Sequence, residues 1–260
     1  MIMSNLATVI TGASSGIGEQ LAKQLAAQEQ QTLVLVARSA DKLHALAEQL
    51  KLAHPIRVEV ISLDLEQVGA AQQLVKSVQD LGLEIDTLIN NAGFGLNDLF
   101  ADMPLERIQG MMQLNMVALT ELCHAVLPAM RQRKQGRIMN IASVAAFQSC
   151  PRFAAYAATK AYVLSLSEAL AAEEKANGIK ITAVCPGATA TAFHDVAGNN
   201  GTFLTKMMDS AEDVAASAIK SLNAGKPVIV TGAMNKPLPF FNRLLPRQCV
   251  VWMAGKLAAT

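Results

Sequence analysis

Short apolar runs alternate with helical patterns along most of this chain, and this alternation constrains the fold more than any other feature. The runs are rich in Val, Ile and Leu, and they predict seven strands at residues 7–11, 33–37, 57–62, 87–90, 137–141, 180–185 and 227–231. Because each run is almost continuously apolar, both faces of every strand should be covered by helices. The sequence therefore predicts an α/β fold with one doubly wound, parallel sheet of the Rossmann type.

A single domain is expected, because no internal repeat, low-complexity stretch or linker divides the 260 residues. Residues 1–235 should form this domain, and residues 236–260 should be an extension rather than a separate domain. Hydrophobic residues make up 52% of the chain and charged residues 17%, which excludes an intrinsically disordered protein. Apolar spacing predicts a long helix over about 105–130, and Ser210 and Gly225 are the expected cap and stop of a later helix.

The expected compartment is the cytoplasm, because the sequence shows neither a secretion signal nor the roughly 18–20 consecutive apolar residues that span a membrane. The four cysteines lie far apart without CxxC spacing, so neither a disulfide framework nor a zinc site is expected. The histidines also lack ligand spacing, and no metal is expected; they are His44, His54, His124 and His194.

Charge is nearly balanced over the whole chain but not along it. The formal net charge is +1, so no global field favours a nucleic-acid partner. No acidic residue occurs after Asp213, whereas six basic residues follow: Lys220, Lys226, Lys236, Arg243, Arg247 and Lys256. The extension also places Val250, Val251, Ala254 and Leu257 on one helical face, with Trp252 nearby. Such an end can lie on anionic lipid as a peripheral membrane contact, but packing on its own or a neighbouring subunit is the favoured interpretation.

A glycine-rich turn follows the first predicted strand and precedes a helix. Residues 11–18 read TGASSGIG, which has GxxxGxG spacing. Glycines in such a turn let backbone N–H groups approach a pyrophosphate at the N-terminus of the helix. Because it lies between a strand and a helix, the turn predicts a dinucleotide site formed by Gly12, Ser14, Ser15, Gly16, Ile17 and Gly18.

The end of the second predicted strand indicates which dinucleotide is bound. An NAD site needs a carboxylate about 20 residues after the glycines, to accept a hydrogen bond from the ribose 2′-OH. Arg38 lies at that distance in this sequence, and a guanidinium can instead hold a 2′-phosphate through charge-assisted hydrogen bonds. The sequence therefore favours NADP(H) as the cofactor.

A candidate proton-transfer group opens a predicted alanine-rich helix that ends near Asn177. Tyr156 and Lys160 are four residues apart, so both side chains lie on one helix face. Since an ammonium near a phenol favours the phenolate, we expect Lys160 to lower the pKa of Tyr156. Ser143 follows the fifth strand and should emerge at the same sheet edge, where it can donate to a substrate oxygen. Asn115 lies inside the helix over 105–130, where a buried polar role is at least as plausible as a surface one.

These motifs together resemble the short-chain dehydrogenase/reductase family over about residues 5–235. The resemblance rests on motifs that occur in the family's order: residues 11–18, Asp64, residues 90–93 (NNAG), Asn115, Ser143, Tyr156 with Lys160, and Pro186 with Gly187. It implies a seven-stranded sheet in the order 3-2-1-4-5-6-7, flanked by helices. It also implies a homodimer or homotetramer built through the helices near 105–130 and 157–176.

The resemblance further implies a role for each matched residue. Tyr156 would be the general acid/base, Ser143 would orient the substrate oxygen, and Lys160 would bind the nicotinamide ribose. Asn115 would hold a water molecule in a proton relay. The remaining matches are expected to bind the cofactor: Asp64 at the adenine, Asn91 and Gly93 along the cleft, and Pro186, Gly187, Thr189 and Thr191 near the nicotinamide.

The expected chemistry is hydride transfer between NADP(H) and the carbonyl or secondary alcohol of a small molecule. Segment 189–209 should be a lid, with Phe193, His194, Phe203, Leu204, Met207 and Met208, and Phe94 and Phe147 should adjoin the nicotinamide. This lining favours an apolar substrate over a charged sugar, although the same side chains could simply cap the core. Two alternative functions stay open: a dinucleotide-binding redox sensor without turnover, and an epimerase or dehydratase on a related fold.

Overall fold

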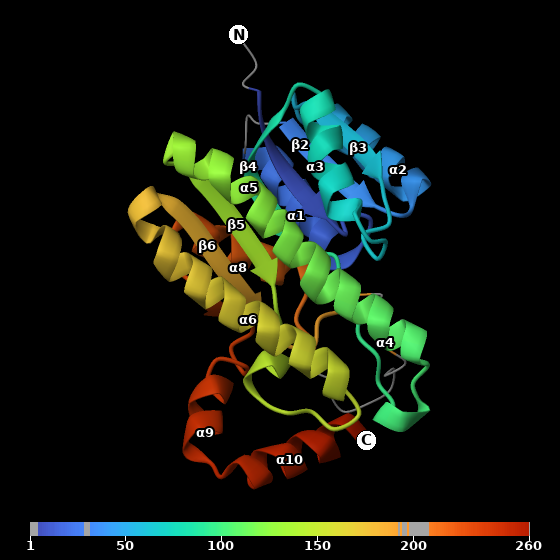
Figure 1. The fold of residues 1–260 in the computed structure, drawn as a ribbon, viewed down its shortest axis with the longest axis vertical. Coiled ribbons are helices and arrows are strands. Elements are labelled where there is room, and N and C mark those ends of the chain that lie inside the picture. The colour runs from blue at the N-terminus through green and yellow to red at the C-terminus, as the bar shows by residue number, and fades with distance from the viewer. Residues whose placement is uncertain (1–4, 29–31, 192, 194–196, 198–207, 260) are drawn as a thin grey trace.

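The computed structural model confirms the predicted seven-stranded parallel sheet (Figure 1). It describes the chain except residues 1–4, 29–31, 192, 194–196, 198–207 and 260. The strand order is β3-β2-β1-β4-β5-β6-β7, as the resemblance implied. The strands are β1 (Leu6–Thr11), β2 (Thr32–Ala37), β3 (Val58–Ser62), β4 (Glu84–Asn90), β5 (Gly136–Ile141), β6 (Ile179–Cys185) and β7 (Val228–Val230).

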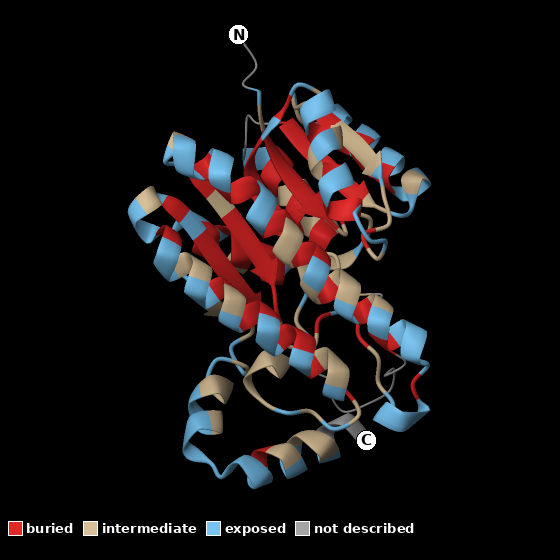
Figure 2. Cartoon of the chain, viewed as in Figure 1, coloured by how far each residue is buried: buried red, intermediate tan, exposed pale blue. Residues whose placement is uncertain are grey.

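Helices cover both faces of the sheet, which explains the continuous apolar character of the strands. One face packs against α3 (Ala70–Asp80), α5 (Leu119–Arg133) and α6 (Ala154–Glu174). The other face packs against α1 (Gly16–Gln28), α2 (Ala40–Ala53) and α8 (Ala211–Asn223). Figure 2 shows the central strands buried behind helices whose outer faces are exposed.

Local signals in the sequence set several helix boundaries. Ser210 caps α8, because its hydroxyl accepts a hydrogen bond from the Asp213 backbone N–H at 3.0 Å. Gly225, with a φ of +66°, lies just beyond the end of this helix, as predicted. α6 is followed by a 3-10 turn (Lys175–Asn177), and Gly178 stops it in the left-handed conformation.

The predicted helix over 105–130 is not continuous α-helix. It consists of α4 (Leu105–Met112), a π-helical segment (Gln113–Ala118) and α5, which runs on to Arg133. A π-helical turn accommodates an extra residue within a helix, and such turns occur often at functional sites. The segment contains Asn115, which is buried.

A buried polar chain connects the centre of the sheet to α6. The Asn90 amide on β4 donates to the Asn140 side-chain carbonyl on β5 at 2.9 Å. The Asn140 amide donates to the Ser167 hydroxyl on α6, also at 2.9 Å, and Ser167 donates to the Val163 carbonyl. Because buried polar groups are costly when unpaired, this chain fixes the position of α6 relative to β4 and β5.

Two helices follow the last strand and lie at one end of the molecule: α9 (Leu238–Leu244) and α10 (Arg247–Ala259) (Figure 1). Val250 is buried, and a Cβ at Gly255 would lie 3.1 Å from Pro151, so α10 packs on its own chain. The Asn242 amide on α9 also donates to the Gln148 side chain. Among the described residues, no helix has the length and apolar character needed to cross a membrane.

Candidate active site

A cavity of about 450 Å³ opens at the carboxyl ends of the strands, where ligands bind in open α/β sheets. It brings together most of the site residues predicted from the sequence. These are Gly12, Ser14, Ser15, Gly16, Ile17, Arg38, Asp64, Asn91, Gly93, Ser143, Tyr156, Lys160, Pro186, Gly187, Thr189 and Thr191. Gly18 and Asn115 do not line the cavity. Gly18 lies directly against Gly12, and Asn115 is hydrogen-bonded to the backbone of Phe94; both Gly12 and Phe94 line the cavity.

The glycine turn can exist only with glycines at its key positions. Gly12 and Gly16 have φ values of +67° and +59°, in the left-handed region that disfavours other residues. A Cβ at Gly18 would lie 2.3 Å from the carbonyl oxygen of Gly12, so this position admits no side chain. The Asn91 amide holds the turn to β4, because it donates to the carbonyls of Thr11 and Gly12 at 3.0 Å each.

Polar side chains cluster where β2 and β3 end. Arg38 is 64% exposed at its side chain and forms an ion pair with Glu66 at 2.8 Å. Asp64 accepts a hydrogen bond from the Glu66 backbone N–H at 3.1 Å and thereby fixes that turn. The exposed guanidinium retains donors for an anionic group, whereas Glu66 is a competing partner that no sequence motif indicates.

Tyr156 lies in the first turn of α6, within an aromatic cluster. Its ring centroid is 5.9 Å from that of Phe153 and 5.4 Å from that of Phe193. The expectation that Lys160 lowers the pKa of Tyr156 is wrong for this structure. Burial raises the pKa of Tyr156 to about 12, and a hydrogen bond with the Ser143 side chain offsets only part of this rise. At neutral pH Tyr156 is therefore protonated and can donate a proton.

Lys160 is buried on the same helix face, one turn further along α6. Its Nζ donates to the Ile141 carbonyl at 2.7 Å and lies 5.8 Å from the centroid of the Tyr156 ring. Burial lowers the pKa of Lys160 to about 8, because desolvation disfavours the ammonium form. Ser143 follows β5, and its Oγ accepts from the Ala145 backbone N–H at 3.1 Å.

Asn115 joins the loop after β4 to the start of α6. Its Oδ1 accepts from the Phe94 backbone N–H at 3.2 Å, and its Nδ2 donates to the Phe94 carbonyl at 3.0 Å. The second amide hydrogen goes to the Thr159 hydroxyl at 3.1 Å. Both donors of this side chain are thus used by protein groups. The water-binding role implied by the resemblance stays a prediction.

The residues predicted to face the substrate do not all line the cavity. Phe94 and Phe193 line the cavity. Phe147 is not among the lining residues and instead packs, partly buried, against the apolar core. Met208 is partly exposed, at 40%. The other predicted lid residues lie outside the described part of the chain: His194, Phe203, Leu204 and Met207.

Several cavity residues were not predicted from the sequence. Arg107 on α4 lines the cavity, with its guanidinium carbon 4.6 Å from the centroid of Phe94. Gln148, Cys150 and Ala254 line it as well. Ala254 comes from α10, and no local sequence pattern shows that the chain end returns to the cavity.

The described residues hold no group of three His, Cys, Asp or Glu side chains placed as a metal site requires. Cys150 is a free thiol within the cavity, and burial raises its pKa to about 11. The polar side chains that line the cavity include the Ser143 hydroxyl, the Tyr156 phenol and the Lys160 ammonium, together with guanidinium, carboxylate and amide groups.

Comparison with known proteins agrees with this geometry. The family described as short chain dehydrogenase matches residues 7–200. The ketoacyl reductase HetN of Nostoc sp. is 37% identical over 179 residues, which is 69% of this chain and 62% of that protein. An uncharacterized oxidoreductase of Staphylococcus aureus is 30% identical over 91% of this chain and 99% of that protein.

Solved structures show the same relationship. A short-chain dehydrogenase from Sphingobium yanoikuyae in complex with NADPH has a TM-score of 0.82 and 32% identity, covering 92% of this chain and 91% of that one. The bulky-bulky ketone specific alcohol dehydrogenase from Comamonas testosteroni has a TM-score of 0.77 and 30% identity, with 93% of each chain covered. The chain belongs to the short-chain dehydrogenase/reductase family. Within that family it is an oxidoreductase.

Proposed function

We propose that the protein is an NADP(H)-dependent carbonyl reductase, or an alcohol dehydrogenase in the reverse direction, for an apolar small molecule. One observation carries this proposal: a protonated phenol, a serine hydroxyl and a buried ammonium line the same cavity as a glycine turn. Tyr156, Ser143 and Lys160 are the residues concerned. A dinucleotide-binding regulator without turnover has no need for these three groups together.

The described residues fit the proposed cofactor. Gly12, Gly16 and Gly18 let the turn pack closely against neighbouring protein atoms that any Cβ would displace, and Ser14 and Ser15 line the cavity at the same turn. These residues would hold the pyrophosphate at the N-terminus of α1. Arg38 would bind the 2′-phosphate, and the NADPH complex of the Sphingobium relative supports this choice.

Other residues would hold the rest of the cofactor. Asp64 would face the adenine, and Asn91 and Gly93 would line the middle of the cleft. Pro186, Gly187, Thr189 and Thr191 line the cavity beyond β6 and would hold the nicotinamide end. When bound, NADPH supplies the hydride that a carbonyl carbon accepts.

The chain's own groups would control the proton. Tyr156, kept neutral by burial, donates its proton to the substrate oxygen, and Ser143 donates a hydrogen bond to the same oxygen. The Lys160 ammonium would bind the hydroxyls of the nicotinamide ribose. Asn115 would position the loop after β4 and hold the relay water next to Lys160.

The walls of the cavity support an apolar substrate. Phe94, Phe153 and Phe193 line it, and the ring of Phe193 contacts that of Tyr156. The ketone-specific alcohol dehydrogenase among the relatives is consistent with this class. We also propose a single catalytic domain over residues 1–235 with the extension 236–260, assembled as a homodimer or homotetramer.

The test is consumption of NADPH in the presence of a panel of carbonyl compounds. The panel contains aromatic, steroid-like and aliphatic ketones and, as polar controls, sugars. We expect turnover with apolar ketones, a preference for NADPH over NADH, and little turnover with sugars. Tight NADPH binding without turnover on any carbonyl compound would contradict the proposed function and favour a nucleotide-binding regulator.

A further inference from the structure

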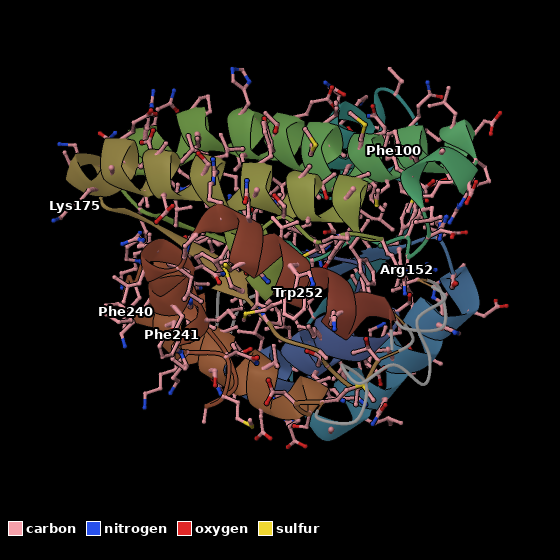
Figure 3. The ribbon with its side chains drawn as sticks, turned by 90° about the horizontal axis from the view of Figure 1, so that it is seen from below. Phe100, Arg152, Lys175, Phe240, Phe241 and Trp252 are labelled. Carbon is pink, nitrogen blue, oxygen red and sulfur yellow. The ribbon has the colours of Figure 1, made fainter. Side chains whose placement is uncertain are left out.

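The end of the molecule formed by α9 and α10 carries a surface that is both apolar and basic, which we call the tail surface. Its exposed apolar side chains include Phe240, Phe241, Leu244, Trp252 and Met253, and its basic ones are Lys236, Arg243, Arg247 and Lys256. Phe240 and Trp252 are 63% and 62% exposed. Figure 3 shows Trp252 on α10 and both phenylalanines on α9 at this end of the molecule. Exposed apolar patches of this kind mark interaction sites.

Packing within the chain does not explain why these apolar side chains are present on the surface. The inward face of α10 is already used, because Val250 is buried, Ala254 lines the cavity and Gly255 packs on Pro151. Trp252 and Met253 lie on the opposite face, and the Lys256 ammonium is 4.5 Å from the centroid of the Trp252 ring. The outward face of α10 therefore exposes large apolar side chains and a cation side by side.

The positive charge of the tail surface indicates what kind of partner binds there. No acidic residue follows Asp213 in the sequence, so no acidic side chain of the same segment balances the charge of Lys236, Arg243 and Arg247. A two-fold contact with a second copy would place like charges against each other. An anionic bilayer complements both properties, because headgroups attract the cations and the interface accepts aromatic side chains.

We propose that the tail surface docks the protein on an anionic phospholipid bilayer. Phe240, Phe241 and Trp252 enter the interfacial region, and Arg243 and Arg247 contact the headgroups. Because Ala254 on the inward face of α10 lines the cavity, docking brings the cavity close to the bilayer. Delivery of an apolar substrate from the lipid would follow, and that consequence alone rests on the proposed function.

The test is co-sedimentation of the full chain with lipid vesicles. One set contains phosphatidylcholine alone, and the other contains about one third phosphatidylglycerol. We expect the protein to pellet with the anionic vesicles, and less so as salt is raised. Arg243→Gln combined with Arg247→Gln should weaken partitioning about twenty-five-fold, at about fivefold for each cation near an anionic surface. Phe240→Ser combined with Trp252→Ser should weaken it by at least about tenfold.

Matched control variants change exposed residues away from the tail surface. Lys76→Gln with Lys175→Gln removes two exposed cations, and Leu52→Ser with Val68→Ser removes two exposed apolar side chains. Both controls should pellet like the wild type. Turnover of a water-soluble ketone should be unchanged in all these variants, which separates failure of docking from failure of the proposed function.

Three results would overturn the proposal. The wild type could stay in the supernatant with anionic vesicles at low salt. The tail-surface variants could pellet as well as their controls. Light scattering could instead show that the tail-surface variants split an oligomer without changing lipid binding, which would assign the surface to a second copy of the chain.

Discussion

Replacing Asn115 by alanine should release the loop after β4 from α6. The substitution removes three buried hydrogen bonds, two with the Phe94 backbone and one with Thr159. At about 0.5–1.5 kcal/mol each, their loss costs roughly 1.5–4.5 kcal/mol, and we expect a value near 3 kcal/mol. Turnover should fall about a hundredfold, because a displacement of about 1 Å among reacting groups has effects of that size.

The assay is urea unfolding followed by circular dichroism, together with kcat for NADPH-dependent reduction. Asn5→Ala is the matched control, because it removes only an exposed hydrogen bond to Glu84 and should cost less than about 0.5 kcal/mol. A loss of stability below about 1 kcal/mol for Asn115→Ala, with unchanged kcat, would refute the idea that this side chain positions the site.

Three further predictions concern the cofactor and the proton. Arg38→Asp should raise KM for NADPH roughly 10–100-fold and reduce the preference over NADH; an unchanged preference would exclude Arg38 from the 2′-phosphate site. Gly18→Ala should destabilise the fold by about 1–3 kcal/mol, because its Cβ would lie 2.3 Å from the Gly12 carbonyl oxygen. It should also abolish NADPH binding measured by fluorescence titration, and normal binding would contradict this account of the turn. Burial lowers the pKa of Lys160 to about 8, so kcat/KM for NADPH should fall as pH rises through about 8 and the ammonium is lost; a flat profile across that range would contradict the assignment.

The sequence predicted the sheet well, because each strand is a separate apolar run whose two ends can be located in the sequence. The helix predicted over 105–130 differs from the structure in its interior and at its end. Apolar spacing does not distinguish a π-helical turn from α-helix, so the segment Gln113–Ala118 could not be anticipated.

The sequence predicted which residues meet at the site, but not how their surroundings change their pKa values. The spacing of Tyr156 and Lys160 placed both on one helix face, yet their pKa values depend on burial by residues distant in sequence. Phe193 reaches Tyr156 from the segment after β6, and Ala254 reaches the cavity from α10. Such long-range contacts leave no periodic pattern in the chain.

Kinetic comparison of the wild type with Tyr156→Phe addresses the central role of the phenol most directly. Both proteins are titrated with NADPH and then assayed for reduction of an apolar ketone. The variant keeps the ring that contacts Phe153 and Phe193 but lacks the hydroxyl. It should bind NADPH as tightly as the wild type and lose at least about a hundredfold in kcat. A variant that reduces the ketone at a near-normal rate would show that the proton comes from another group.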